Sequence, residues 1–161
     1  MSEKMTNMNE TNIQNTDTDE EQNLLLVTFG LDGAWYGLAA SQVQEVIQVT
    51  DNTVVYHAPP YVRGIINLRC KIVTVLNLET KLGLSEHPIG NDSRILIVHW
   101  NHEQVGLLVE VVAEVISLSE EQIETVPLNI SEGLSRFLKG VCNSENRLIG
   151  ILDLDKVLAE K

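Results

Sequence analysis

The chain has 161 residues, a net charge of −12, and a hydrophobic content of 43% with only 4% aromatic. This length suits one domain, or two small ones that share an aliphatic core. Its 11 Lys and Arg residues are scattered rather than clustered, so we expect no nucleic-acid partner. The chain also lacks an apolar run of the ~18 residues that a membrane span needs, and lacks a signal peptide; we predict a cytoplasmic protein without membrane insertion.

Residues 1–22 are polar and acidic, with six acidic side chains and a single lysine. Such a segment has too little apolar surface to offset the entropy that is lost when a chain becomes ordered. We expect it to be a disordered tail, and the folded domain to comprise residues 23–161.

Short apolar runs in the first half predict β-strands with two helical pieces between them. The expected strands are 24–29, 34–38, 53–56 and 71–78, with a hairpin turn at 30–33. Ser41 and Gln44 have the spacing of a capping box, which predicts a short helix through Val43, Val46 and Ile47. A double proline at 59–60 predicts a new element, a helical turn that ends near residue 67.

A linker at 83–91 precedes a second half built on the same plan. We expect strands at 94–100 and 104–110, with 111–118 continuing the latter through a bend, and a closing hairpin of 137–143 and 147–152. Leu154, Val157 and Leu158 share one face of a C-terminal helix. Short strands at this spacing are typical of small antiparallel barrels.

Two blocks of the sequence occur twice. A shift of 76 residues lays 61–82 on 137–158 with five identities in 22 positions, among them Gly64 on Gly140. A shift of 69 residues lays 37–47 on 106–116 with six identities in 11. Because both blocks recur in the same order, we interpret the chain as a duplicated β-rich unit, with subdomains of about 23–90 and 91–161.

No group of residues indicates catalysis, a cofactor or a metal. His99 and His102 lie at a strand end and a turn, without a matching framework of Cys, Asp or Glu ligands. Cys70 and Cys142 are interpreted as free thiols of a reducing compartment. We therefore expect no enzyme activity, no cofactor and no bound metal.

Acidic and amide residues recur just past the ends of two predicted strands. Asn77 and Glu79 in the first copy correspond to Asp153 and Asp155 in the second. Helix N-caps explain these positions better than acid–base chemistry does.

Arg69 is flanked by apolar residues in the segment 67–70. An arginine in such a place either pairs with a carboxylate from elsewhere in the chain, Glu45 being a candidate, or is offered to a partner. The second copy carries Glu145 at the aligned position, so the apolar scaffold is repeated while the arginine is not. We therefore expect Arg69 to serve partner binding.

Several segments together resemble the CheW-type chemotaxis coupling proteins. They are the Tyr36-Gly37 end of the first hairpin, VQEVI at 43–47, PPYVRGIINLR at 59–69, IVTVLNL at 72–78, QVG at 104–106 and VVAEV at 111–115. The resemblance covers residues 23–160. Two positions depart from the family pattern, since Cys70 stands where glycine is usual and Thr74 where proline is frequent.

The resemblance implies a mainly all-β fold of two intertwined five-stranded SH3-like β-barrels with short helices and a C-terminal helix. It also implies a non-enzymatic adaptor, recruited to membrane-associated receptor arrays, that couples the cytoplasmic tip of transmembrane chemoreceptors to the regulatory domain of the histidine kinase CheA. An adaptor of a pilus or twitching-motility system is the alternative.

By the same resemblance, the receptor docks in the groove between the barrels. The positions that match the family in or around this groove are Val43, Glu45, Val46, Gly64, Arg69, Ile95 and Val115. The alternative for Val43, Val46, Ile95 and Val115 is that they are core residues without a role in binding.

Overall fold

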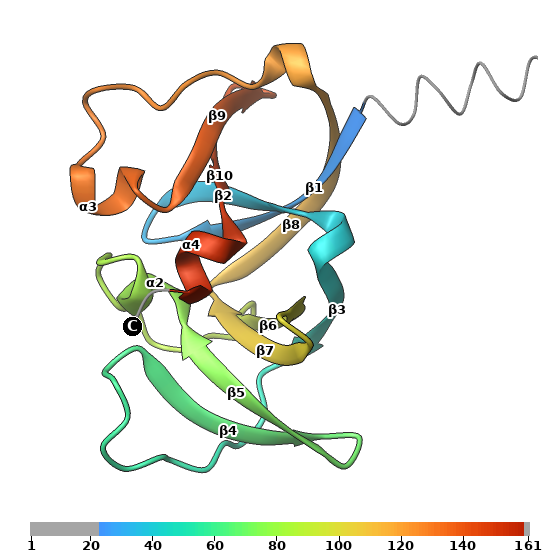
Figure 1. The fold of residues 1–161 in the computed structure, drawn as a ribbon, viewed down its shortest axis with the longest axis vertical. Coiled ribbons are helices and arrows are strands. Elements are labelled where there is room, and N and C mark those ends of the chain that lie inside the picture. The colour runs from blue at the N-terminus through green and yellow to red at the C-terminus, as the bar shows by residue number, and fades with distance from the viewer. Residues whose placement is uncertain (1–22, 160–161) are drawn as a thin grey trace, which may run out of the picture.

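The structure of the protein is a computed structural model that describes residues 23–159; the predicted disordered tail, residues 1–22, lies outside the described residues. The described part of the chain folds into two five-stranded sheets with short helices between the strands (Figure 1). The strands are β1 (Asn23–Leu31), β2 (Ala34–Ala39), β3 (Val43–Gln48), β4 (Val62–Leu68), β5 (Lys71–Asn77), β6 (Arg94–Trp100), β7 (Glu103–Val109), β8 (Val111–Ser119), β9 (Leu138–Ser144) and β10 (Arg147–Leu152). The helices are α2 (Leu78–Lys81), α3 (Glu132–Ser135) and α4 (Leu154–Ala159), with 3-10 turns at Ala40–Gln42 and Glu120–Gln122.

Each sheet combines strands from both sequence repeats. Sheet A has the order β8-β1-β2-β10-β9, and sheet B has the order β3-β6-β7-β5-β4. The β1–β2 hairpin of the first repeat therefore lies in sheet A, whose other three strands come from the second repeat. The β6–β7 hairpin of the second repeat lies in sheet B, whose other three strands come from the first repeat. This exchange makes the two SH3-like barrels intertwined, as the family resemblance implies.

The exchange also introduces parallel pairing, which the expectation of antiparallel barrels did not include. β2 runs parallel to β10, with Gly37 opposite Ile151, and β7 runs parallel to β5, with Gly106 opposite Val75. The two contacts are equivalent under the offsets of 69 and 76 residues. The two repeats of the sequence therefore also pair their strands in the same way.

Three apolar clusters fill the part of the chain that the structure describes. One lies within sheet B and includes Ile66 and Ile95, and one lies within sheet A and includes Leu26 and Cys142. The largest lies between the barrels and draws side chains from both sheets and from α4. Burial of this shared cluster joins the two barrels.

The four two-residue hairpin turns found between residues 23 and 159 place both of their residues at positive φ. These are Asp32-Gly33, Arg69-Cys70, Asn101-His102 and Glu145-Asn146. Such turns match the right-handed twist of the flanking strands, and glycine or asparagine adopts them at least cost. Cys70 adopts this conformation, at φ 68°, although it is neither glycine nor asparagine.

Two expected helical pieces are strands in the structure. The predicted helix over 43–47 is β3, preceded by a 3-10 turn, because Val43, Glu45 and Ile47 also alternate at strand spacing and β3 pairs with β6. The predicted helical turn before residue 67 is β4, whose residues Val62 to Leu68 pair with β5. In both places sheet pairing overrides the local helix signal.

Two expected strands also differ. Of 53–56, Thr53 alone pairs, in an isolated bridge with Ile65, while Val54 to Tyr56 are exposed. Residues 111–118 do not extend β7; they form β8, which lies in sheet A, because the chain changes sheet at Glu110. Among the helices of residues 23–159, none has the length and apolar character that crossing a membrane requires.

Candidate functional site

The tip of the β4–β5 hairpin carries Arg69, whose guanidinium extends to Glu45 on β3. Nη1 donates to Oε2 of Glu45 at 2.6 Å, and Nη2 donates to Oε1 at 2.8 Å. Since β3 and β4 are the two outer strands of sheet B, this bidentate pair connects the opposite edges of one sheet.

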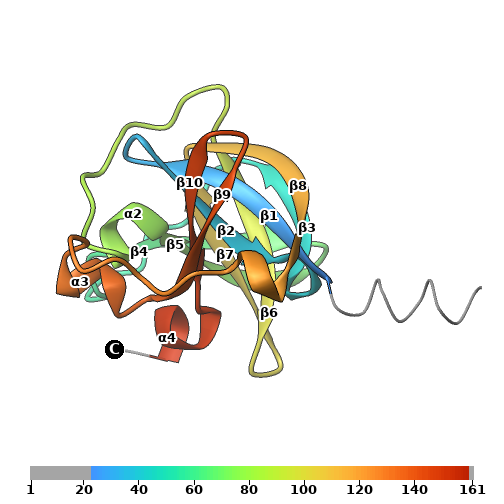
Figure 2. The same ribbon diagram turned by 90° about the horizontal axis from the view of Figure 1, so that it is seen from above.

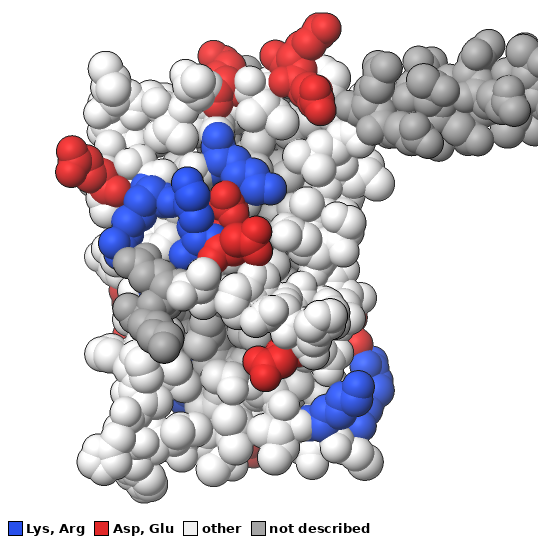
Figure 3. Space-filling model, in the orientation of Figure 1, with Lys and Arg blue, Asp and Glu red and all other residues white. Residues whose placement is uncertain are grey.

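The ion pair faces solvent unequally, with 69% of the Arg69 side chain and 26% of the Glu45 side chain exposed. Hydrogen bonds from Arg69 lower the pKa of Glu45 against an opposing effect of desolvation, and the same bonds raise the pKa of Arg69. A guanidinium has more N–H donors than the two that Glu45 occupies. Figure 3 shows basic atoms beside acidic atoms at the lower right, over the end of the β4–β5 hairpin.

The aliphatic candidates divide into exposed and buried positions. Val46 on β3 is 42% exposed, whereas Val43 is half-buried and packs against the shared cluster. Val115 on β8 is 56% exposed, and β8 and β3 lie on the same side of the molecule in Figure 1 and Figure 2. Ile95 is 1% exposed and lies among the core residues of sheet B, away from any surface.

Gly64 is buried and serves the backbone. A Cβ there, at φ 153°, would lie 2.3 Å from Nδ2 of Asn52 and 2.4 Å from the carbonyl oxygen of Thr53. The missing side chain lets residues 52–53 pass against β4, where Thr53 and Ile65 exchange backbone hydrogen bonds of 2.8 and 2.9 Å. In this structure Gly64 positions the chain and presents no group to a partner.

The second repeat uses its glycine in the same way. A Cβ on Gly140 would lie 2.7 Å from the carbonyl oxygen of Glu124, and Glu124 pairs with Val141 in the bridge that corresponds to Thr53 and Ile65. The identity of Gly64 and Gly140 in the sequence repeat therefore has a steric cause.

A polar hollow of about 560 Å³ lies beside the hairpin, lined by Gln44, Lys71, Ile72, Thr74, His99, His102, Glu103 and Gln104. Across it, the side-chain amide of Gln104 donates to the side-chain oxygen of Gln44 at 2.7 Å. The two histidines that the sequence singled out thus share a wide, open surface.

The predicted helix N-caps are confirmed for Asn77 and Asp153. The Asn77 side chain accepts hydrogen bonds from the backbone of α2, and Asp153 does the same for α4. Glu79 and Asp155 lie two residues further on, in the first turn of each helix, and do not cap. The Asp155 carboxylate accepts from the indole of Trp100 at 2.8 Å, which joins α4 to β6.

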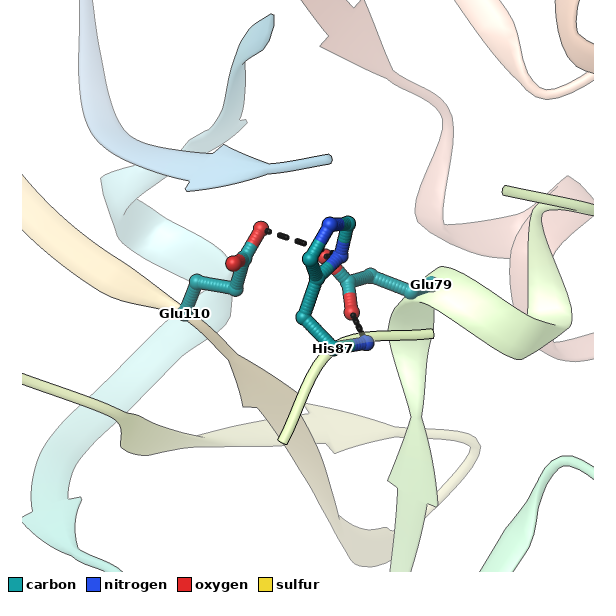
Figure 4. A group of neighbouring side chains, drawn as sticks. All are labelled: Glu79, His87 and Glu110. Atoms are coloured by element: carbon teal, nitrogen blue, oxygen red, sulfur yellow. Dashed lines mark hydrogen bonds and ion pairs between the residues drawn. The ribbon is translucent and has the colours of Figure 1, made fainter. Parts of the chain in front are cut away.

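The sequence did not predict that Glu79 belongs to a cluster of ionisable side chains. Its carboxylate is buried and lies beside His87 and Glu110 (Figure 4). The three residues come from α2, the connector before β6, and the β7–β8 junction, so no spacing motif links them. The available signal was an acidic residue immediately after an apolar strand.

Comparison with known proteins identifies the family. The sequence profile of the CheW-like domain matches residues 25–161. The chain is 30% identical over 133 residues to the chemotaxis protein CheW of Bacillus subtilis, covering 83% of this chain and 85% of that one. It is 31% identical over 135 residues to the chemotaxis protein CheW of Thermotoga maritima, covering 84% and 87% of the two chains.

A solved structure has the same fold. The scaffolding protein TtCheW from Thermoanaerobacter tengcongensis superposes with a TM-score of 0.75 at 34% sequence identity, over 81% of this chain and 84% of that chain. The match agrees with the two intertwined barrels described above. The chain therefore belongs to the CheW family of chemotaxis coupling proteins.

Proposed function

We propose that this protein is a non-enzymatic adaptor that couples chemoreceptors to the histidine kinase CheA in cytoplasmic, membrane-associated arrays. The receptor is bound through its cytoplasmic tip, and the kinase through its regulatory domain. Support for this role comes from the family membership and from the likeness to a solved scaffolding protein. The relatives that match are named as chemotaxis proteins, which gives the pilus alternative no support.

The observation that carries the receptor contact is the bidentate ion pair of Arg69 with Glu45, which lies open to solvent at the edge of sheet B. Glu45, Val46, Arg69 and Val115 form what we call the partner surface. It combines a fixed guanidinium, which suits carboxylate or carbonyl groups at a helix end, with apolar area that a helical receptor tip covers. Ile95 and Val43 support this surface from the core.

Arg69 has two candidate roles, an internal brace for Glu45 and a contact for the receptor. Exposed ion pairs contribute little to stability because both charges are well solvated when apart. We therefore expect Arg69→Ala to remain folded, to bind a soluble receptor-tip fragment roughly 10- to 100-fold more weakly, and to bind the kinase regulatory domain normally. Titration calorimetry with both partners, beside thermal melts, makes the comparison.

The charge-swapped double variant Glu45→Arg with Arg69→Glu separates the two roles. It keeps opposite charges at the two positions but reverses what the receptor meets. If the pair is only a brace, the double variant regains the receptor affinity that each single variant loses. Restored affinity would contradict the proposed receptor contact, whereas continued loss in a protein that still binds the kinase domain supports it.

The exposed aliphatic part of the surface is tested by Val46→Asp. Since Val46 is 42% exposed, the variant should melt near the wild-type temperature while losing receptor binding. Ile95→Ala is the matched control, because removing a fully buried side chain should cost about 2–5 kcal/mol of stability. A Val46→Asp protein with unchanged receptor affinity would remove β3 from the receptor contact.

A further inference from the structure

A cluster of ionisable side chains lies apart from the partner surface, where the connector between β5 and β6 folds back on the barrels (Figure 4). Glu79 comes from the first turn of α2, His87 from the connector, and Glu110 from the junction of β7 and β8. Asp32, in the β1–β2 turn, borders the same cluster. The group therefore gathers segments of both sheets.

The spacing of the donor atoms fits a coordination sphere. Nδ1 of His87 lies 3.3 Å from Oε2 of Glu79 and 3.9 Å from Oε2 of Glu110, and one donor atom from each of the three residues lies within 4.8 Å of the others. Ligand bonds of about 2.0–2.2 Å to Zn²⁺ put neighbouring donors roughly 3–3.6 Å apart. Small side-chain adjustments would bring all three atoms onto one ion.

Surrounding groups already orient the three side chains. The backbone N–H of His87 donates to Oε1 of Glu79 at 2.9 Å, and the backbone N–H of Asp32 donates to Oε2 of Glu79 at 2.8 Å and of Glu110 at 2.5 Å. Nε2 of His87 lies 3.6 Å from Oδ1 of Asp32. A carboxylate behind the far nitrogen is a usual orienting partner of a metal-bound imidazole. Nδ1 of His87 lies 3.1 Å from the backbone oxygen of Ser85, and an ion bound at Nδ1 would replace this contact.

The local charge also favours a cation. The Glu79 side chain is only 4% exposed, and Nδ1 of His87 lies within ion-pair distance of both Glu79 and Glu110. Burial, and next the adjoining Glu110 carboxyl, raise the pKa of Glu79. A buried negative charge is costly when unpaired, so a cation bound beside Glu79 and Glu110 would favour the ionised form of both carboxyl groups.

We propose that Glu79, His87 and Glu110 form a binding site for Zn²⁺ or a similar first-row divalent cation, with Asp32 as the residue that orients the imidazole. Carboxylate and imidazole donors together suit Zn²⁺ better than Mg²⁺ or Ca²⁺, which prefer oxygen alone. The bound ion fastens the exposed connector to α2 and to the β7–β8 junction. It acts as a clamp and is independent of the receptor contact.

The test is calorimetric titration of the untagged full chain with Zn²⁺. We expect one ion per chain, no comparable binding of Mg²⁺ or Ca²⁺, and a melting temperature that rises with Zn²⁺ concentration because the ion binds the folded state. His87→Ala is the principal variant, since this side chain is 40% exposed and its loss leaves the core intact. It should abolish the one-site binding and the rise in melting temperature.

Further variants distinguish this site from surface histidines. Glu110→Gln should weaken Zn²⁺ binding strongly, and Asp32→Asn should weaken it roughly 10- to 100-fold, as expected for an orienting residue. His99→Ala, in the polar hollow, is the matched control and should bind as the wild type does. The proposal is overturned if the wild type binds no Zn²⁺, if His87→Ala binds it equally well, or if His99→Ala is the variant that loses binding.

Protease protection gives a separate readout. The connector residues 85–92 are exposed in the structure, so a protease should cleave there more slowly when Zn²⁺ is present. The protection should be absent in His87→Ala at the same Zn²⁺ concentration. Equal cleavage of the wild type with and without the ion would show that no clamp forms.

Discussion

Arg69 holds the carboxylate of Glu45 in its ionised form through two charge-assisted hydrogen bonds. We therefore expect the pKa of Glu45 to rise in Arg69→Ala, because the loss of these bonds removes the main cause of its lowered value. NMR titration of the Glu45 side-chain carboxyl in the two proteins makes the measurement. An unchanged pKa would show that the pair does not persist in solution.

The same shift has a defined consequence for stability. A carboxyl whose pKa is lower in the folded state stabilises that state above the pKa of the unfolded chain, and the contribution is lost as the pH falls through the folded value. The pair should thus be intact near neutral pH and should break in acid. Receptor binding through Arg69 is accordingly expected to keep its geometry throughout the neutral range.

Cys70 adopts a backbone conformation that is unfavourable for a residue with a side chain. Its φ of 68° lies in the left-handed region, which costs a residue with a Cβ roughly 1–2 kcal/mol, while glycine avoids that cost and loses part of the gain through its more flexible unfolded state. We expect Cys70→Gly to raise the free energy of unfolding by about 0.5–1 kcal/mol.

Asn146 provides the control for this prediction, since it occupies the equivalent turn position in the second repeat at φ 65°. Asparagine tolerates this region better than cysteine, so Asn146→Gly should gain less. Denaturant unfolding of both variants tests the difference. A larger gain at Asn146 than at Cys70 would refute the backbone explanation.

At the scale of elements, β4 depends on a glycine for its contact with the preceding segment. Gly64→Ala should destabilise the chain by roughly 1–3 kcal/mol, because a Cβ would overlap Asn52 and Thr53 and neither backbone can withdraw without breaking the bridge to β4. Thermal and denaturant unfolding give the measurement. Gly90→Ala is the control, since a Cβ there meets no atom within 4 Å.

The outcome at Gly64 also affects how receptor-binding variants are interpreted. If Gly64→Ala binds receptor weakly and is also destabilised, the loss reflects displacement of β4 and the Arg69 turn. A stable Gly64→Ala protein that fails to bind would instead place the receptor directly over this strand.

At the scale of the molecule, the exchange of hairpins predicts that neither half folds alone. A fragment of residues 23–90 carries β1 and β2 without the other strands of sheet A, and β3, β4 and β5 without the central hairpin of sheet B. So small a unit buries little apolar area against its chain entropy. We expect fragments 23–90 and 91–161 to be unfolded separately and to assemble into the native fold when mixed.

Circular dichroism and heteronuclear NMR spectra of the separate and mixed fragments decide this prediction. Equimolar mixing should restore a cooperative melt and the spectrum of the intact chain. A monomeric fragment 23–90 that unfolds cooperatively, with a stability close to that of the full chain, would contradict the shared-core interpretation. A folded dimer of one fragment would mean that two copies of the same repeat exchange hairpins.

The sequence by itself determined the features that depend on a residue and its near neighbours. Apolar runs located most of the strands, and Asn77 and Asp153 marked the starts of two helices. Internal identities such as Gly64 with Gly140 revealed the duplication, because the same steric demand arises in each copy. The segment VQEVI was ambiguous, since its apolar residues satisfy both helix and strand periods, and pairing with β6 decided for the strand.

Tertiary structure decided which strands pair and which distant side chains meet. A strand's period specifies its faces but not its neighbour, so the exchange of hairpins and the parallel contacts of β2 with β10 and of β5 with β7 left no local trace. For the same reason the approach of Arg69 to Glu45 was one of two open alternatives, and the meeting of Glu79 with His87 and Glu110 was not foreseen. Each of these contacts joins segments that only the folded chain brings together.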